Sequence, residues 1–92
     1  MEPSPNAVEV KATEGYRVWV RFEDGLAAEI DFTDLVERGG YYGTPLRDPA
    51  FFRRVDMYPG GYGIFWPNEA DVCPDRLYEL ARETTRAIAQ TR

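Results

Sequence analysis

The chain has 92 residues, 43% hydrophobic and 14% aromatic, which is enough for one modest core and excludes the disordered class. Its 16 acidic and 11 basic residues give a net charge of −5, which disfavours binding to a nucleic-acid backbone. No apolar run approaches the roughly 20 residues of a membrane span, and the N-terminus lacks the pattern of a signal peptide. Because Cys73 is the only cysteine, no internal disulfide can form, so we expect a soluble cytoplasmic protein.

The N-terminal half predicts a tail followed by three strands. Residues 1–6 contain two prolines and are expected to form a flexible tail, and residues 8–12 form a short strand candidate. Residues 16–22 and 26–32 both alternate between apolar and polar side chains, the pattern of half-buried strands. These two strands should form a hairpin with one face in the core.

The turn between the two alternating strands sets their register. A two-residue loop would place Val20 beside Glu29 and spoil both faces. A three-residue loop over residues 23–25 instead pairs Val20 with Ala28 and keeps the apolar faces together. It also sets Arg17 opposite Asp31, Val18 opposite Ile30 and Tyr16 opposite Phe32. We therefore expect Gly25 to adopt a positive φ.

The middle of the chain carries two helix-start signals. Thr33 is expected to cap a short helix over residues 34–38, which Gly39 and Gly40 end. Asp48 followed by Pro49 is the second signal, with aspartate at the N-cap and proline at the first helical position. One or two helical turns should follow.

The C-terminal part predicts a hairpin and a helix. Residues 55–58 and 62–66 pair around a Pro-Gly-Gly turn, in a register that the pattern leaves open. Pro74 begins the C-terminal helix, whose apolar stripe consists of Leu77, Leu80, Ala81, Thr84 and Ile88. We predict that Leu77, Leu80 and Ile88 pack on the sheet face formed by Val18, Val20 and Ile30.

These elements predict one α+β domain over residues 7–92. It would hold an antiparallel sheet of about five short strands, several short helices and a C-terminal helix packed on one face.

Three segments resemble a bacterial family called domain of unknown function 2442. They are FEDG at the hairpin tip, the LRDPAFF segment and GIFWPNEADVCPDRLYEL. The resemblance covers residues 8–80 and implies an α+β fold with no established activity. It also implies a setting beside toxin–antitoxin genes. Some members carry a helix-turn-helix domain behind this one; we expect none here, because a single helix follows the motif.

Enzyme chemistry finds little support in these residues. The sequence has no histidine, which removes the commonest general base and excludes the usual catalytic triads and zinc sites. Cys73 precedes Pro74 at the expected N-cap, where a thiol can become reactive, although a small buried cap residue is the plainer interpretation. The acids Glu69, Asp71, Asp75 and Glu79 are interpreted as structural. We assign no catalytic, cofactor or metal residue.

Two groups of residues are candidate binding elements. Arg17, Trp19 and Arg21 point away from the apolar face, and aromatic and arginine side chains are typical of binding hot spots. Arginine stacking on Trp19, or cover by the tail or a loop, would explain them structurally. The second group, at the end of a strand, consists of Trp66, Pro67, Asn68 and Asp71.

Three functions compete. The favoured one is a protein-binding or regulatory module, antitoxin-like or an adaptor, with an unknown protein partner or a second copy of the chain. The first alternative is a small enzyme or ligand-binding protein that uses acidic residues near Trp66. The second is a nucleic-acid-associated accessory protein, against which the net acidity weighs.

Overall fold

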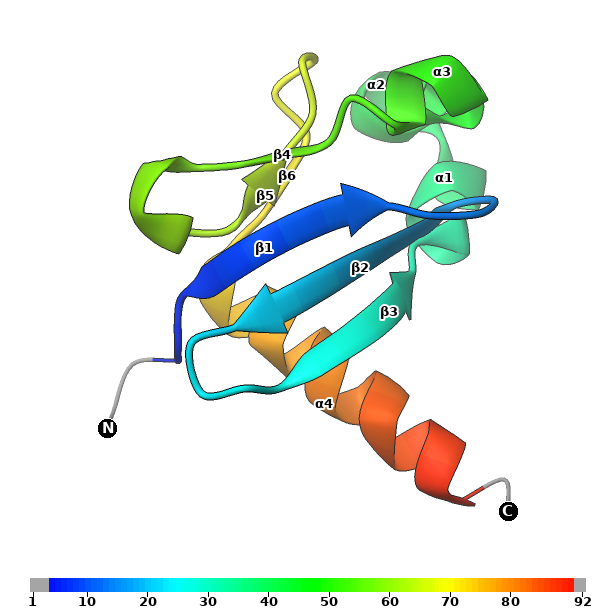
Figure 1. Ribbon diagram of the computed structural model, residues 1–92. Helices are drawn as coiled ribbons and strands as arrows, with labels where there is room; N and C mark the ends of the chain where they lie inside the picture. The colour runs from blue at the N-terminus through cyan, green and yellow to red at the C-terminus, as the bar shows by residue number, and fades with distance from the viewer. Residues whose placement is uncertain (1–3, 91–92) are drawn as a thin grey trace.

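The computed structural model describes residues 4–90, and an antiparallel sheet forms its N-terminal half (Figure 1). Its strands β1 (Ala7–Ala12), β2 (Arg17–Phe22) and β3 (Ala27–Asp31) lie in the order β1-β2-β3. Residues 1–3 of the expected tail lie outside the described residues. The carbonyl of Asn6 accepts a hydrogen bond from the backbone N–H of Glu23, so the end of the tail lies against the β2–β3 turn.

The predicted register of the β2–β3 hairpin is confirmed. Val18 pairs with Ile30 and Val20 with Ala28, which sets all four side chains on the core face. A hydrogen bond from the Phe22 N–H to the Leu26 carbonyl (2.8 Å) closes the three-residue loop. Within that loop Gly25 has a φ of 92°, as the loop geometry requires.

Short helices connect the two halves of the chain. They are α1 (Thr33–Arg38), α2 (Gly40–Gly43), the 3-10 turn η1 (Thr44–Arg47) and α3 (Pro49–Phe52). The cap predicted at Asp48 is confirmed, since its carboxylate accepts a hydrogen bond from the Ala50 N–H. The cap predicted at Thr33 is wrong: Phe32 is the N-cap, and the Thr33 hydroxyl donates instead to the Asp31 carboxylate.

A second antiparallel sheet follows the short helices. It consists of β4 (Asp56–Met57), β5 (Ile64–Phe65) and β6 (Asp71–Val72), with the 3-10 turn η2 (Pro59–Gly61) between β4 and β5. The predicted hairpin is present, in the register that pairs Met57 with Ile64. The expectation of about five strands in one sheet is wrong, because residues 4–90 form six strands in two three-stranded sheets. The strand that the pattern missed is β6, which is too short to show an alternation.

The C-terminal helix α4 (Pro74–Gln90) begins at Pro74 as predicted and covers the inner face of the first sheet (Figure 1). Leu77 and Ala81 are completely buried, and Leu80 is half-buried against the core. Ile88 is 61% exposed, so the prediction that it packs on the sheet is wrong. The reason is length, since the last turns of α4 extend past the sheet (Figure 1).

Both sheets and the helices share one hydrophobic core, which confirms the α+β class. Its completely or almost completely buried large side chains are Val18, Val20, Phe22, Ile30, Leu46, Phe52, Ile64, Trp66 and Leu77. None of the helices within residues 4–90 combines the length and the hydrophobicity needed to cross a membrane.

Candidate functional site

The outer face of the first sheet carries the first group of candidate residues. Because Val18 and Val20 point into the core, Arg17, Trp19 and Arg21 point to the opposite face. Trp19 occupies the centre of this face, with Lys11 of β1 on one side and Glu29 of β3 on the other. The indole is half-buried and does not pack against the core cluster. We call this surface, made of Glu9, Lys11, Arg17, Trp19, Arg21 and Glu29, the Trp19 face.

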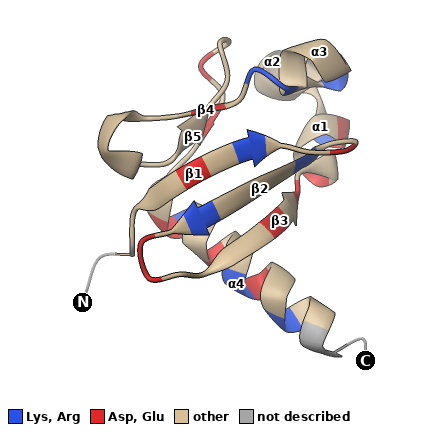
Figure 2. Ribbon diagram, in the orientation of Figure 1, with Lys and Arg blue, Asp and Glu red and all other residues tan. Residues whose placement is uncertain are grey.

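Two ion pairs flank the indole. Arg17 lies 3.5 Å from the Glu29 carboxylate, and Arg21 lies 3.2 Å from the Glu9 carboxylate. Figure 2 shows the resulting alternation of basic and acidic residues across the three strands. The four charged side chains are about half exposed, so each pair contributes little to stability.

The structure also bears on the two structural explanations for Trp19. The cation–π contact found within residues 4–90 joins the Arg54 guanidinium to the Phe51 ring, 5.9 Å from its centre, and does not involve Trp19. Stacking of an arginine on the indole therefore does not explain the position of Trp19. Arg17, Arg21 and Glu29 around it are exposed, so no described segment covers this face. Any cover by residues 1–3 lies outside the described residues.

Trp66, by contrast, is part of the core. It is completely buried, and its indole N–H donates a hydrogen bond to the carbonyl of Phe52 at 2.8 Å. The ring centres of Phe32 and Phe52 lie 5.8 and 5.5 Å, respectively, from the ring centre of Trp66. Trp66 thus joins α3 to the end of β5, and its side chain is not accessible to a ligand.

The other residues of this motif tie loops together. Asn68 donates a hydrogen bond to the Tyr42 carbonyl (3.0 Å), and its side-chain oxygen accepts one from the Ala70 N–H (3.3 Å). Asp71 accepts a hydrogen bond from the hydroxyl of Tyr58 (3.1 Å). Partial desolvation and this bond raise the pKa of the Tyr58 hydroxyl. Among residues 4–90, no three acidic or thiol groups gather in a way that could hold a metal ion.

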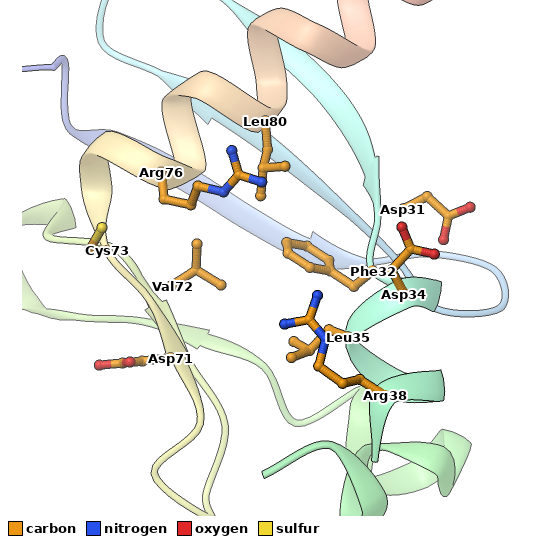
Figure 3. Close-up of a pocket in the computed structure, with 10 residues that line it drawn as sticks. All are labelled: Asp31, Phe32, Asp34, Leu35, Arg38, Asp71, Val72, Cys73, Arg76 and Leu80. Carbon is orange, nitrogen blue, oxygen red and sulfur yellow. The ribbon is translucent and has the colours of Figure 1, made fainter. Parts of the chain in front are cut away.

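A hollow of about 490 Å³ lies elsewhere, between α1, β6 and the start of α4 (Figure 3). The sequence pattern does not reveal it, because its basic residues Arg38 and Arg76 are far apart in the chain. Cys73 also lines it and is exposed, contrary to the expectation of a buried cap residue. The Cys73 carbonyl accepts the hydrogen bond of the Leu77 N–H, which places this residue at the start of α4 as predicted.

Comparison with known proteins identifies a family for this chain. No curated protein and no solved structure matches the chain. The model of the family described as "protein of unknown function (DUF2442)" matches residues 7–83, which include both sheets, all the short helices and the first turns of α4. The chain therefore belongs to the DUF2442 family.

Proposed function

We propose that this chain is a protein-binding module and that the Trp19 face is its binding surface. The observation that carries the proposal is the position of Trp19, at the centre of a sheet face that no segment within residues 4–90 covers. Trp19 does not pack against the core cluster and keeps part of its indole open to water, so a partner that covers the rest of the indole would gain apolar burial.

The surroundings of Trp19 match the composition of a binding hot spot. Such spots consist of a large aromatic or arginine side chain surrounded by polar residues that keep water out once the partner is bound. Here Arg17 and Arg21 flank the indole, and their carboxylate partners Glu29 and Glu9 lie on the neighbouring strands. Because exposed ion pairs are weak, these arginines can exchange their partners for acidic groups of another protein at small cost.

The proposal includes the regulatory roles that the family resemblance implies. An antitoxin-like protein and an adaptor in a bacterial cytoplasm both act by binding another protein. The proposal also includes a homodimer, in which the Trp19 face of one copy of the chain binds a second copy. No observation favours an enzyme that uses acids near Trp66, since Trp66 is buried and Asp71 is hydrogen-bonded to Tyr58.

The test compares Trp19→Ala with Tyr41→Ala, which removes an exposed aromatic side chain from α2. Proteins captured by the wild-type chain from an extract of its own organism would be purified and titrated against each variant, and sedimentation equilibrium would report self-association. We expect Trp19→Ala to weaken the complex or dimer at least about tenfold and Tyr41→Ala to leave it unchanged.

Thermal denaturation is the control. Trp19→Ala should shift the melting temperature by no more than about 3 °C, as surface substitutions do. If Trp19→Ala lowers the melting temperature by several degrees more than this, and the wild type neither binds a partner nor self-associates, Trp19 has a structural role and the proposal is wrong.

A further inference from the structure

The hollow between α1, β6 and α4 has an apolar floor. Phe32 is buried at its base, and Leu35, Val72 and Leu80 are half-buried around it, each packed against the core with part of its surface left open (Figure 3). Its volume of about 490 Å³ falls within the range of small-ligand sites. We call this hollow the α1–α4 groove.

Two guanidinium groups reach into the same space. Arg38 comes from the last turn of α1 and Arg76 from the first turn of α4, and Figure 3 shows both side chains directed into the groove. Arg76 has an ion pair with Glu79 at 2.6 Å. Within residues 4–90, the Arg38 side chain has neither an ion pair nor a hydrogen bond. The groove therefore contains an arginine side chain without an ion pair beside apolar surface.

Most of the nearby carboxylates are turned away or already bonded. Asp31 accepts hydrogen bonds from the backbone N–H and the hydroxyl of Thr33, which lower the pKa of this carboxyl. Asp71 accepts the hydrogen bond of Tyr58 (3.1 Å), and Figure 3 shows both carboxylates pointing away from the groove. Asp34, on the α1 rim, is the remaining acid. The N-terminus of α4, where Cys73 lines the groove, adds the partial positive charge of the helix dipole.

We infer that the α1–α4 groove binds an organic carboxylate that carries an apolar group beside the acid. Arg38 and Arg76 would hold the carboxylate, since planar guanidinium groups match its geometry, and the floor of Leu35, Val72 and Leu80 would take the apolar group. This chemistry is shared by the free C-terminal residue of a polypeptide with an aliphatic side chain and by a small aliphatic acid. The site is on a different surface from the Trp19 face and does not depend on it.

The test is a titration of the whole ¹⁵N-labelled chain followed by NMR. N-acetyl-leucine supplies the carboxylate and the aliphatic group, and N-acetyl-leucinamide is the matched probe without the charge. We expect N-acetyl-leucine to produce saturable shift changes at the amides of Leu35, Val72 and Leu80, and the amide probe to produce none at the same concentrations.

Substitutions then identify the groups that bind. Arg38→Gln should weaken N-acetyl-leucine about tenfold, the loss expected when a charge-assisted bond is removed. Arg53→Gln, at an exposed arginine outside the groove, should change the affinity less than twofold. Asp34→Asn should tighten binding severalfold, because it removes the remaining acid on the rim. A well-dispersed spectrum of each variant shows that it is folded.

Hexanoate distinguishes the two sources of the carboxylate. Tighter binding of N-acetyl-leucine than of hexanoate supports a polypeptide terminus, and equal or tighter binding of hexanoate supports a small acid. The inference is overturned if N-acetyl-leucine gives no saturable change, if the amide probe binds equally well, or if a folded Arg38→Gln variant binds like the wild type.

Discussion

The hydroxyl of Tyr78 donates a hydrogen bond to the carboxylate of Asp24 and so joins α4 to the tip of the β2–β3 hairpin. The same tyrosine ring packs edge-to-face on Phe22, with the ring centres 5.0 Å apart. The hydrogen bond from Tyr78 and a second one from the Leu26 N–H lower the pKa of Asp24 below its ordinary value of 3.8. The contact between the β2–β3 hairpin and α4 therefore depends on the protonation state of the Asp24 carboxyl group.

Stability should therefore depend on pH through this contact. Because the pKa of Asp24 is lower in the folded than in the unfolded chain, its contribution is present above pH 3.8 and is lost as the pH falls through the folded value. Tyr78→Phe removes the hydrogen bond and keeps the ring. We expect the variant to be less stable than the wild type in urea titrations at pH 7, with a difference that narrows below about pH 4.

The comparison of wild type with Tyr78→Phe controls for the other carboxyl group whose pKa is lowered. The lowered pKa of Asp31, caused by its bonds to Thr33, is common to both proteins and cancels in the difference. A stability gap between wild type and Tyr78→Phe that stays constant from pH 7 to pH 2 would show that the Asp24 contact does not stabilise the fold.

A second prediction separates backbone conformation from packing at two glycines. Gly25 and Gly61 both have positive φ, 92° and 78°. A Cβ at Gly25 would meet nothing within 4 Å, whereas one at Gly61 would lie 2.2 Å from the carbonyl oxygen of Ala7. Gly25→Ala should cost about 1–2 kcal/mol through the left-handed conformation alone. Gly61→Ala should cost about 1–3 kcal/mol more, because β1 must move.

Chemical denaturation of the two variants measures both costs. Equal losses of stability would mean that the close approach of η2 to β1 is not maintained in solution. The m-value should stay unchanged in both variants if the free energy of unfolding alone is affected.

The parts of the fold that follow from local rules were predictable. The β2–β3 register follows from alternation, since a slip of one residue would place Val20 and Glu29 side by side on the same face of the sheet. The Asp48 cap and the start of α4 at Pro74 follow from side-chain chemistry near the chain itself.

Features that depend on tertiary contact could not be predicted in this way. The strand β6 has only two residues and is defined by its pairing with β5. Ile88 continues the apolar stripe of α4 but is exposed, and the last turns of this helix extend past the sheet (Figure 1). For the candidate sites, alternation alone placed Trp19 on the outer face, whereas the α1–α4 groove arises because Arg38 and Arg76 come together only in the fold.

A third prediction concerns the contact of α4 with the first sheet. Leu77 is completely buried there, so Leu77→Ala should cost about 2–5 kcal/mol of unfolding free energy. Leu80→Ala should cost less, because that side chain is half-buried at the groove. Glu83→Ala, at an exposed position of the same helix, is the control and should change stability by less than about 0.5 kcal/mol. Urea titrations that give Leu77→Ala and Glu83→Ala the same midpoint would contradict this packing.

The last prediction uses the two tryptophans as reporters of their different environments. Trp66 is completely buried and Trp19 is only half-buried, so each should give a distinct fluorescence signal when it is the sole tryptophan. Trp19→Phe leaves Trp66, whose emission should lie at shorter wavelength and resist quenching by acrylamide. Trp66→Phe leaves Trp19, whose emission should lie at longer wavelength and be readily quenched.

The same pair of variants should differ in stability. Trp66→Phe removes the hydrogen bond from the indole to the Phe52 carbonyl, which keeps only the 3.3 Å bond from the Val55 N–H. The loss of one such bond costs about 0.5–1.5 kcal/mol before any loss of packing is added. Trp19→Phe loses no core contact and no hydrogen bond made within residues 4–90, so it should cost less than about 0.5 kcal/mol. Equal quenching constants together with equal losses of stability would show that the two indoles share one environment, and that Trp19 is not available on the outer face for a partner.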